Sequence, residues 1–246
     1  MSRFKLIALS MLVVFAASAL AAASAAAAPG CEEVGGEKCF WQIQGAKLKE
    51  KETKEFTASA NKNFVLKGKV KAVAVELKWE KLKVKAGALL VGGEPGDNEE
   101  SFVFEEVKVE QPKFCSIPGK KIETNPLKSE LVELVKAGVV QKVDDVLFEP
   151  KKGTILAELE FEGAECPVKN ALEPARLQGT ILAEPTNRNK LEAVVGHQKF
   201  TNEKLEYRKH ASNVVEKAKL ELEANLAEFE GEDNIELVSK QKWSTA

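Results

Sequence analysis

The chain has only two histidines in 246 residues, His197 and His210, and it lacks the short motifs of the common hydrolases. It contains no G-x-S-x-G, no H-E-x-x-H and no C-x-x-C sequence. A catalytic histidine needs an orienting carboxylate and a nucleophile or metal beside it, and the sequence presents no such set. We therefore interpret both histidines as surface residues, His197 in a turn after Gly196, and predict no catalytic residues, no metal ligands and no cofactor.

Long blocks of one charge are also missing. The 36 basic and 38 acidic residues give a net charge of −2, and lysine and glutamate alternate along the whole chain. This pattern is typical of a solvated surface and argues against nucleic acid or an acidic membrane as partner. Pairs such as Asp144-Asp145 and Glu105-Glu106 offer carboxylates for a glycosidase, but so many acids make no pair distinctive.

The N-terminus has the order of a secretory signal peptide. Arg3 and Lys5 precede an apolar run from Leu6 to about Leu20, and a stretch rich in Ala and Ser follows up to Ala28. The Ala-rich second half favours a cleavage region over a membrane anchor. We predict a signal peptide over residues 1–27, a secreted domain over residues 28–246 and no integral membrane segment after signal removal.

A second mode of export stays open at the predicted cleavage region. Cys31 follows Pro29-Gly30, so a small residue precedes a cysteine, as in a lipid-anchored bacterial protein. The usual aliphatic residue three positions earlier is missing, and Pro29 fits that pattern badly. Secretion is therefore the expectation, and a lipid anchor on Cys31 is the alternative.

Four cysteines lie in the predicted mature chain, at Cys31, Cys39, Cys115 and Cys166. Export would place them in an oxidising compartment, where four cysteines allow three pairings. We favour Cys31–Cys39, which would close a short loop, together with Cys115–Cys166, which would join distant strands. Zinc binding is disfavoured because close paired spacings and nearby histidines are absent.

Hydrophobic residues alternate with polar ones through most of the mature chain. Val75, Leu77 and Trp79 alternate with Glu76 and Lys78, and the same period of two recurs at sites up to Ile235 and Leu237. This period predicts strands with one buried face. Turn residues separate the strands, at 61–63, 92–98, 118–119, 161–163, 187–189 and 231–234.

The pattern predicts an all-β fold, either an antiparallel β-sandwich or two packed sheets, tied by disulfides. At most one or two short helices are expected, with residues 128–136 the best candidate. Residues 213–226 have a helix-capping pattern at Asn213 and Glu216, but Leu220 and Leu222 alternate with charged residues and favour a strand. A split into two domains near residues 113–123 is left open.

Two further features suggest binding. Residues 94–100, Glu-Pro-Gly-Asp-Asn-Glu-Glu, gather oxygen ligands that calcium prefers, but without the spacing of an EF-hand, so a solvated hairpin tip is the favoured interpretation. Tryptophan and tyrosine side chains could stack on sugars. Trp79 lies in the apolar phase of its strand, so core packing is its default role, whereas Trp41 and Trp243 lie near the two ends of the mature chain and could be exposed.

The six residues GTILAE occur twice, at 153–158 and 179–184. In a strand, Ile155, Ala157 and Leu159 would share one face, and the second copy would repeat this until Pro185 removes a backbone donor. No reactive group recurs, so we interpret the repeat as scaffold. We expect the two copies to run in the same direction on either side of one intervening strand.

Several segments together resemble a known family. They are an Ala-rich signal, an early cysteine-rich loop, AGALLVGGEPG at 86–96, IETNPLKSEL at 122–131, FEPKKGT at 148–154 and IELVS at 235–239. This order resembles a family of uncharacterised secreted β-rich proteins found in multiple copies in soil actinobacteria. The resemblance implies export and an all-β fold, and it implies no activity or ligand.

The sequence predicts an exported, non-enzymatic protein that acts at the cell surface or outside the cell, by adhesion, envelope structure or ligand binding. Its expected partner is cell-wall or extracellular polysaccharide or protein. A secreted hydrolase that uses carboxylates is the alternative, and a calcium-dependent extracellular module is a weaker one.

Overall fold

The computed structural model describes residues 40–93, 95–169, 173–186, 195–201, 205–210, 212 and 214–245. The predicted signal peptide and the expected Cys31–Cys39 disulfide lie outside them and stay predictions. Within the described residues the fold is all-β, as the alternation predicts, with a single 3-10 turn, η1 (Pro118–Lys120). No helix in these ranges is long and apolar enough to cross a membrane.

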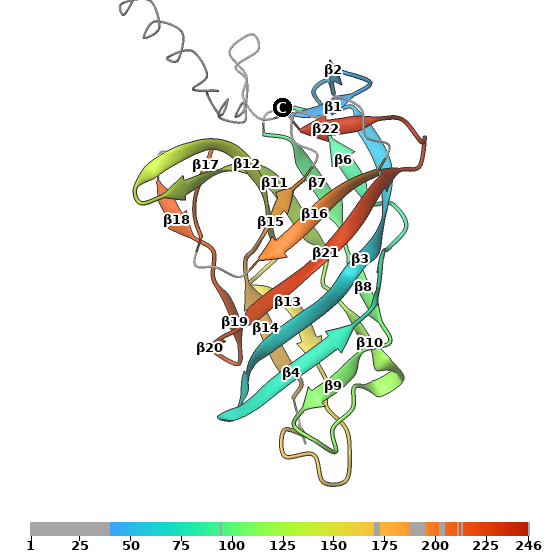
Figure 1. The fold of residues 1–246 in the computed structure, drawn as a ribbon, viewed down its shortest axis with the longest axis vertical. Coiled ribbons are helices and arrows are strands. Elements are labelled where there is room, and N and C mark those ends of the chain that lie inside the picture. Colours follow the sequence, from blue (N-terminus) through green and yellow to red (C-terminus); the bar gives the residue numbers. More distant parts are fainter. Residues whose placement is uncertain are drawn as a thin grey trace, which may run out of the picture.

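The largest sheet is antiparallel, and eight of its described strands close into a ring, which we call the closed ring. Its strands cross the molecule obliquely (Figure 1). In order around the ring they are β3 (Thr53–Val70), β6 (Leu89–Val91), β7 (Asp97–Glu100), β11 (Leu127–Lys136), β12 (Val139–Pro150), β15 (Ile181–Pro185), β16 (Val195–Thr201) and β21 (Glu228–Leu237). The antiparallel β fold is thus present, and its largest sheet encloses the core by closing on itself.

β3 continues beyond the ring and carries a second group of strands, the annex. The annex covers the lower end of the ring in Figure 1. Its strands are β4 (Val73–Trp79), β5 (Lys81–Val84), β8 (Phe102–Glu105), β9 (Lys108–Gln111) and β10 (Lys121–Glu123), with a four-stranded sheet of β13 (Ile155–Leu159), β14 (Ala175–Gly179), β19 (Leu220–Leu222) and β20 (Asn225–Leu226). Strands before and after residues 113–123 share one hydrophobic core.

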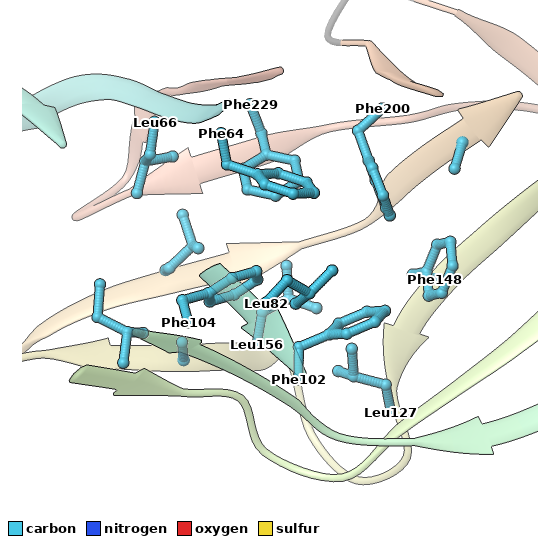
Figure 2. Packing of buried hydrophobic residues seen from close by; sticks show 14 of the residues in the cluster. Phe64, Leu66, Leu82, Phe102, Phe104, Leu127, Phe148, Leu156, Phe200 and Phe229 are labelled. Carbon is cyan, nitrogen blue, oxygen red and sulfur yellow. The ribbon is translucent and has the colours of Figure 1, made fainter. Parts of the chain in front are cut away.

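Seven rings form an aromatic core where the annex meets the closed ring, and Figure 2 labels its phenylalanines. Trp79 and Phe104 have centroids 4.8 Å apart, and Phe200 and Phe229 have centroids 5.5 Å apart in an edge-on arrangement. The aromatic core comprises Phe64, Trp79, Phe102, Phe104, Phe148, Phe200 and Phe229. Such buried aromatic pairs stabilise a fold beyond their area alone.

A small three-stranded sheet lies at the opposite end and joins the two ends of the described chain. It contains β1 (Trp41–Ile43), β2 (Ala46–Lys47) and β22 (Trp243–Thr245). Trp41 and Trp243 are both buried, with ring centroids 5.8 Å apart. Neither tryptophan is exposed, although a place near a chain end would have allowed it, because strand pairing turns both indoles into the core.

The candidate helix at residues 128–136 is a strand, β11. Its inner face lines the closed ring, and its outer face, with Val132, packs against Leu147, Leu182 and Tyr207. This outer cluster lies where β17 (Glu206–Lys209) and β18 (Val215–Lys217) extend the sheet. Because residues 131–135 are buried on both faces of β11, this part of the sequence loses the alternation that marks a strand.

Two predicted turns are strand interiors instead. Residues 61–63 lie within β3 and residues 231–234 lie within β21, and the two segments pair with each other through shifts of register. Asn and Gly at these places accommodate a bulge, which sharpens the local twist of paired strands. Gly231 is needed for a further reason, since a β carbon there would lie 2.1 Å from the ring of Phe64.

The two GTILAE copies occupy different sheets. The first contributes to β13, which pairs with β14, whereas the second forms β15 of the closed ring between β12 and β16. The expected meander with one intervening strand is therefore wrong. A register shift between Ile155 and Ala157 also brings Leu156 into the core, which strict alternation would not allow.

The Cys115–Cys166 disulfide is present, as predicted, with an S–S distance of 2.01 Å. It joins the loop after β9 to the loop after β13, and the two loops also form a bridge between Ser116 and Glu162. The disulfide closes a loop across 51 positions of sequence. In the chain-entropy model a loop of this length stabilises the fold by about 4 kcal/mol.

Candidate functional site

The tryptophans and the tyrosine do not form a sugar-stacking surface. Trp41, Trp79, Trp243 and Tyr207 are all buried. Trp79 belongs to the aromatic core, as its phase in the strand predicts. Sugar recognition by stacking on these residues is thus excluded, because no ring face is open to a ligand.

The other predicted candidates are scattered. Glu105 and Glu106 pair with Lys83 and Lys81 on the annex surface. Asp144 and Asp145 are buried in β12. His210 lies in a turn after β17, and the backbone of His197 lies inside strand β16 rather than in the expected turn.

The predicted calcium loop is divided by the strand that it contains. Residues 97–100 form β7, where Asp97 and Glu99 are exposed and Asn98 and Glu100 are buried. Successive side chains of a strand point to opposite faces. The oxygens of this segment therefore cannot all converge on one ion, but the division creates two distinct polar sites.

The first site is a surface groove of about 330 Å³ along β7, β11 and β12. Pro95 and Val91 border it, and its polar wall comes from Asp97, Glu99, Lys128, Glu130, Glu149 and Lys151. A volume of this size is at the lower end for small-ligand sites. We call it the charged groove.

Cross-strand pairing sets the charges of the groove. Glu99 lies opposite Lys128, but Asp97 lies opposite Glu130, so two acids face each other across β7 and β11. Like charges in directly opposed positions destabilise a sheet. Because this pair of acids lowers stability, Asp97 and Glu130 are candidates for a functional role.

Lys209 relieves part of this repulsion. Its Nζ lies 2.7 Å from a Glu130 carboxylate oxygen and 2.8 Å from Glu149. Lys128 adds a contact of 2.7 Å to Glu149. Glu130 and Glu149 are therefore neutralised from within the protein.

Asp97 has no such partner: no cation of the described residues lies within ion-pair distance of its carboxylate. Burial and the charge of Glu130 raise the pKa of Asp97, against the influence of Lys128 and Lys209. The charge of a cationic ligand group would lower the pKa of Asp97 and offset the repulsion between Asp97 and Glu130. The charged groove thus has one carboxylate suited to a positive ligand group.

The second site lies inside the closed ring. Asn98 and Glu100 of β7, Ser129 of β11, Gln198 of β16 and Asp233 of β21 are all buried there. We call these five residues the polar layer. Asn98 pairs with Ser129 across one strand boundary, and Gln198 pairs with Asp233 across another.

Large rings close the polar layer on both sides. Gly231, two residues from Asp233, lets the Phe64 ring approach on the side of the aromatic core. Gly96, two residues from Asn98, lets Trp41 approach on the other side, where a β carbon would lie 2.7 Å from the indole. The polar layer is therefore shut off from solvent.

This enclosure changes the acidity of both carboxyls. Burial raises the pKa of Glu100 to about 8, although the Ser129 hydroxyl donates a 2.9 Å hydrogen bond to its Oε1. Burial raises the pKa of Asp233 well above its ordinary value, the charge of Glu100 adds to the rise, and nearby backbone N–H groups oppose it. Neither carboxyl is accessible to a polymeric substrate.

The aromatic core contains one small cavity. The apolar cavity in the aromatic core is about 30 Å³, lined by residues such as Phe102 and Phe200. Small-ligand pockets have roughly 300–1,000 Å³. This cavity therefore has no room for a lipid or another small apolar ligand.

Sequence patterns missed the polar layer for identifiable reasons. Asp233 and Asn98 lie in segments rich in turn residues, and Gln198 follows the expected turn at Gly196-His197. The sequence did offer one signal: in a strand, Asn98 and Glu100 share one face, and Asp97 and Glu99 share the other. The sequence alone does not tell which of these two faces is buried inside the ring.

Comparisons with family models, with curated proteins and with solved structures found no match to this chain.

Proposed function

We propose that the protein is exported and acts at the cell surface or outside the cell as a non-enzymatic binding protein, with the charged groove as its contact site. The observation that carries this proposal is the uncompensated Asp97 carboxylate in an open groove. The apolar interior has no room for a small ligand, and the carboxyls of the polar layer are closed to a polymer. Recognition at the surface is the remaining route.

The chemistry of the groove specifies the kind of partner. Asp97 would receive an ammonium or guanidinium group, and Lys151, at 2.7 Å from Glu99, offers a polar contact beside it. Amine-bearing cell-wall polysaccharide and a basic segment of an extracellular protein both carry such a group. The disulfide Cys115–Cys166 supports export, since disulfides persist in oxidising compartments.

Export is tested by expressing the full chain in an actinobacterial host and separating medium, cell wall and cytoplasm. We expect mature protein outside the cytoplasm, with an N-terminus near residues 26–28 by mass spectrometry. Leu12→Arg, which interrupts the apolar run, should leave the precursor inside. Mature wild-type protein confined to the cytoplasm would refute export, and a lipid mass on Cys31 would establish the anchored alternative.

Binding is tested with the purified mature protein on chitosan, polylysine and uncharged dextran. We expect retention on the first two, reduced by salt, and about tenfold weaker binding for Asp97→Asn, since a charge-assisted contact contributes roughly 1.4 kcal/mol or more. Glu106→Gln on the annex is the matched control and should bind as wild type. Equal binding by both variants would remove the groove from the proposal.

A further inference from the structure

The polar layer contains more oxygen acceptors than donors to satisfy them. Asn98 Oδ1, Gln198 Oε1 and both carboxylate oxygens of Asp233 have no hydrogen-bond partner of normal geometry among the described residues, although the backbone N–H groups of Gln198 and Asp233 lie close enough to lower the pKa of Asp233. Each of these residues is at most 1% exposed. A buried polar group without a partner lowers the stability of the fold. All the unpartnered side-chain atoms of the layer are oxygens, which is the arrangement that a positive charge stabilises.

These oxygens come from strands on two parts of the ring wall. β7 and β11 supply Asn98 and Glu100 with Ser129, and β16 and β21 supply Gln198 and Asp233. The two groups are within electrostatic reach, because the charge of Glu100 affects Asp233. Ser129 is already oriented toward Glu100 by its hydrogen bond. The ring therefore brings together oxygens that are more than 130 positions apart in sequence.

We propose that the polar layer is a binding site for one hard divalent cation of the calcium class. The carboxylates of Glu100 and Asp233 would balance its charge, and oxygens of Asn98, Gln198 and Ser129 would complete the ligand set.

The ligand types determine the class of metal. Calcium takes six to eight oxygen ligands, including amide oxygens, in flexible geometry. The polar layer has no imidazole or thiolate, which zinc and copper prefer. Among the described residues no three His, Cys, Asp or Glu side chains cluster as a metal site, so neutral oxygens must supply the ligands beyond two carboxylates. Two carboxylates with one divalent ion leave no net charge to bury.

This site differs from a calcium loop formed by residues 94–100 alone. Asp97 and Glu99 of that loop face outward, and only Asn98 and Glu100 enter the layer. Because each of the five residues is at most 6% exposed, the cation would have to enter while the ring assembles. The metal must therefore be present during folding in any test.

The test is to unfold the mature protein in urea with EDTA and refold it with either calcium or EDTA. After desalting, we expect about one calcium per chain by mass spectrometry in the first sample only. The melting temperature should be higher by roughly 5–10 °C with calcium, in line with binding to the folded state alone. The increase should be larger at pH 8 than at pH 5.5, because calcium and protons compete for the same carboxyls.

Two variants locate the bound ion. Asp233→Asn and the milder Glu100→Gln should lose the retained calcium and the melting shift, whereas Glu99→Gln, on the outward face of the same strand, should keep both. If a variant does not refold, proton release by the wild-type protein is measured instead. Refolding with calcium near pH 7 should release about two more protons per chain than refolding with EDTA.

Three results would overturn the proposal. One is wild-type protein that retains no calcium. Another is a melting temperature that depends on pH but is identical with calcium and EDTA, which would make the layer a proton site only. The last is retention of calcium by both interior variants, which would place the ion elsewhere.

Discussion

The aromatic core lies where the annex meets the closed ring, and the polar layer lies beside it inside the ring, yet the two regions are built in opposite ways. In the aromatic core, rings such as Phe64 and Phe229 pack at 5.7 Å with almost no free volume. In the polar layer, Asp233 and Gln198 are equally buried but leave oxygens unpartnered. Because burial is equal, the contrast shows that burial alone does not indicate stabilisation. One region holds the ring together, and the other lowers stability unless a positive charge enters it.

The contrast is tested most strongly in the aromatic core. Phe64→Ala should lower the free energy of unfolding by about 3–5 kcal/mol, because it removes a fully buried ring that contacts four others. Urea unfolding followed by tryptophan fluorescence measures this. A loss below about 1 kcal/mol would show that the core is not the main source of stability.

Removing the disulfide tests how much the stability of the annex depends on the link between its loops. The double variant Cys115→Ser, Cys166→Ser should lower the free energy of unfolding by about 2–4 kcal/mol, since the closed loop no longer restricts the unfolded chain. The same urea titration applies, with reduced wild type as the control. Unchanged stability in both samples would mean that strand pairing alone closes these loops.

The polar layer should give the protein an unusual dependence on pH. In metal-free protein, Glu100, with a pKa of about 8, and Asp233 stay protonated when folded and lose their protons on unfolding above about pH 4.5. Stability should therefore be greatest near pH 4–5 and fall as pH rises toward 8, by about 1.4 kcal/mol per pH unit for each of the two carboxyls.

Melting curves in EDTA across this pH range measure the effect, and Glu100→Gln should reduce the slope. Glu123 is the contrasting case, because hydrogen bonds from Lys121 and Lys85 lower its pKa to about 2 at the surface. Glu123→Gln should leave the slope between pH 5 and 8 unchanged. A stability that rises over this range would contradict the protonated layer.

The sequence determined the local features of this protein. Alternation at Val75, Leu77 and Trp79 predicted a strand and its buried face, because side chains alternate across any strand. The spacing of cysteines favoured the Cys115–Cys166 pair, which is present. The first inference needs only a short pattern, and the second had to choose among three cysteine pairings. Neither required knowing which strands pair.

Only the tertiary structure decided the rest, because closure of the ring is set by pairings between distant segments. Pairing of β21 with β3 turned 231–234 from an expected turn into strand, and thereby placed Asp233 inside the ring. Pairing of β1 with β22 buried Trp41 and Trp243. Local sequence fixes which residues share a face of a strand, but the partners of that strand decide whether the face meets solvent, an aromatic core or a buried set of oxygens.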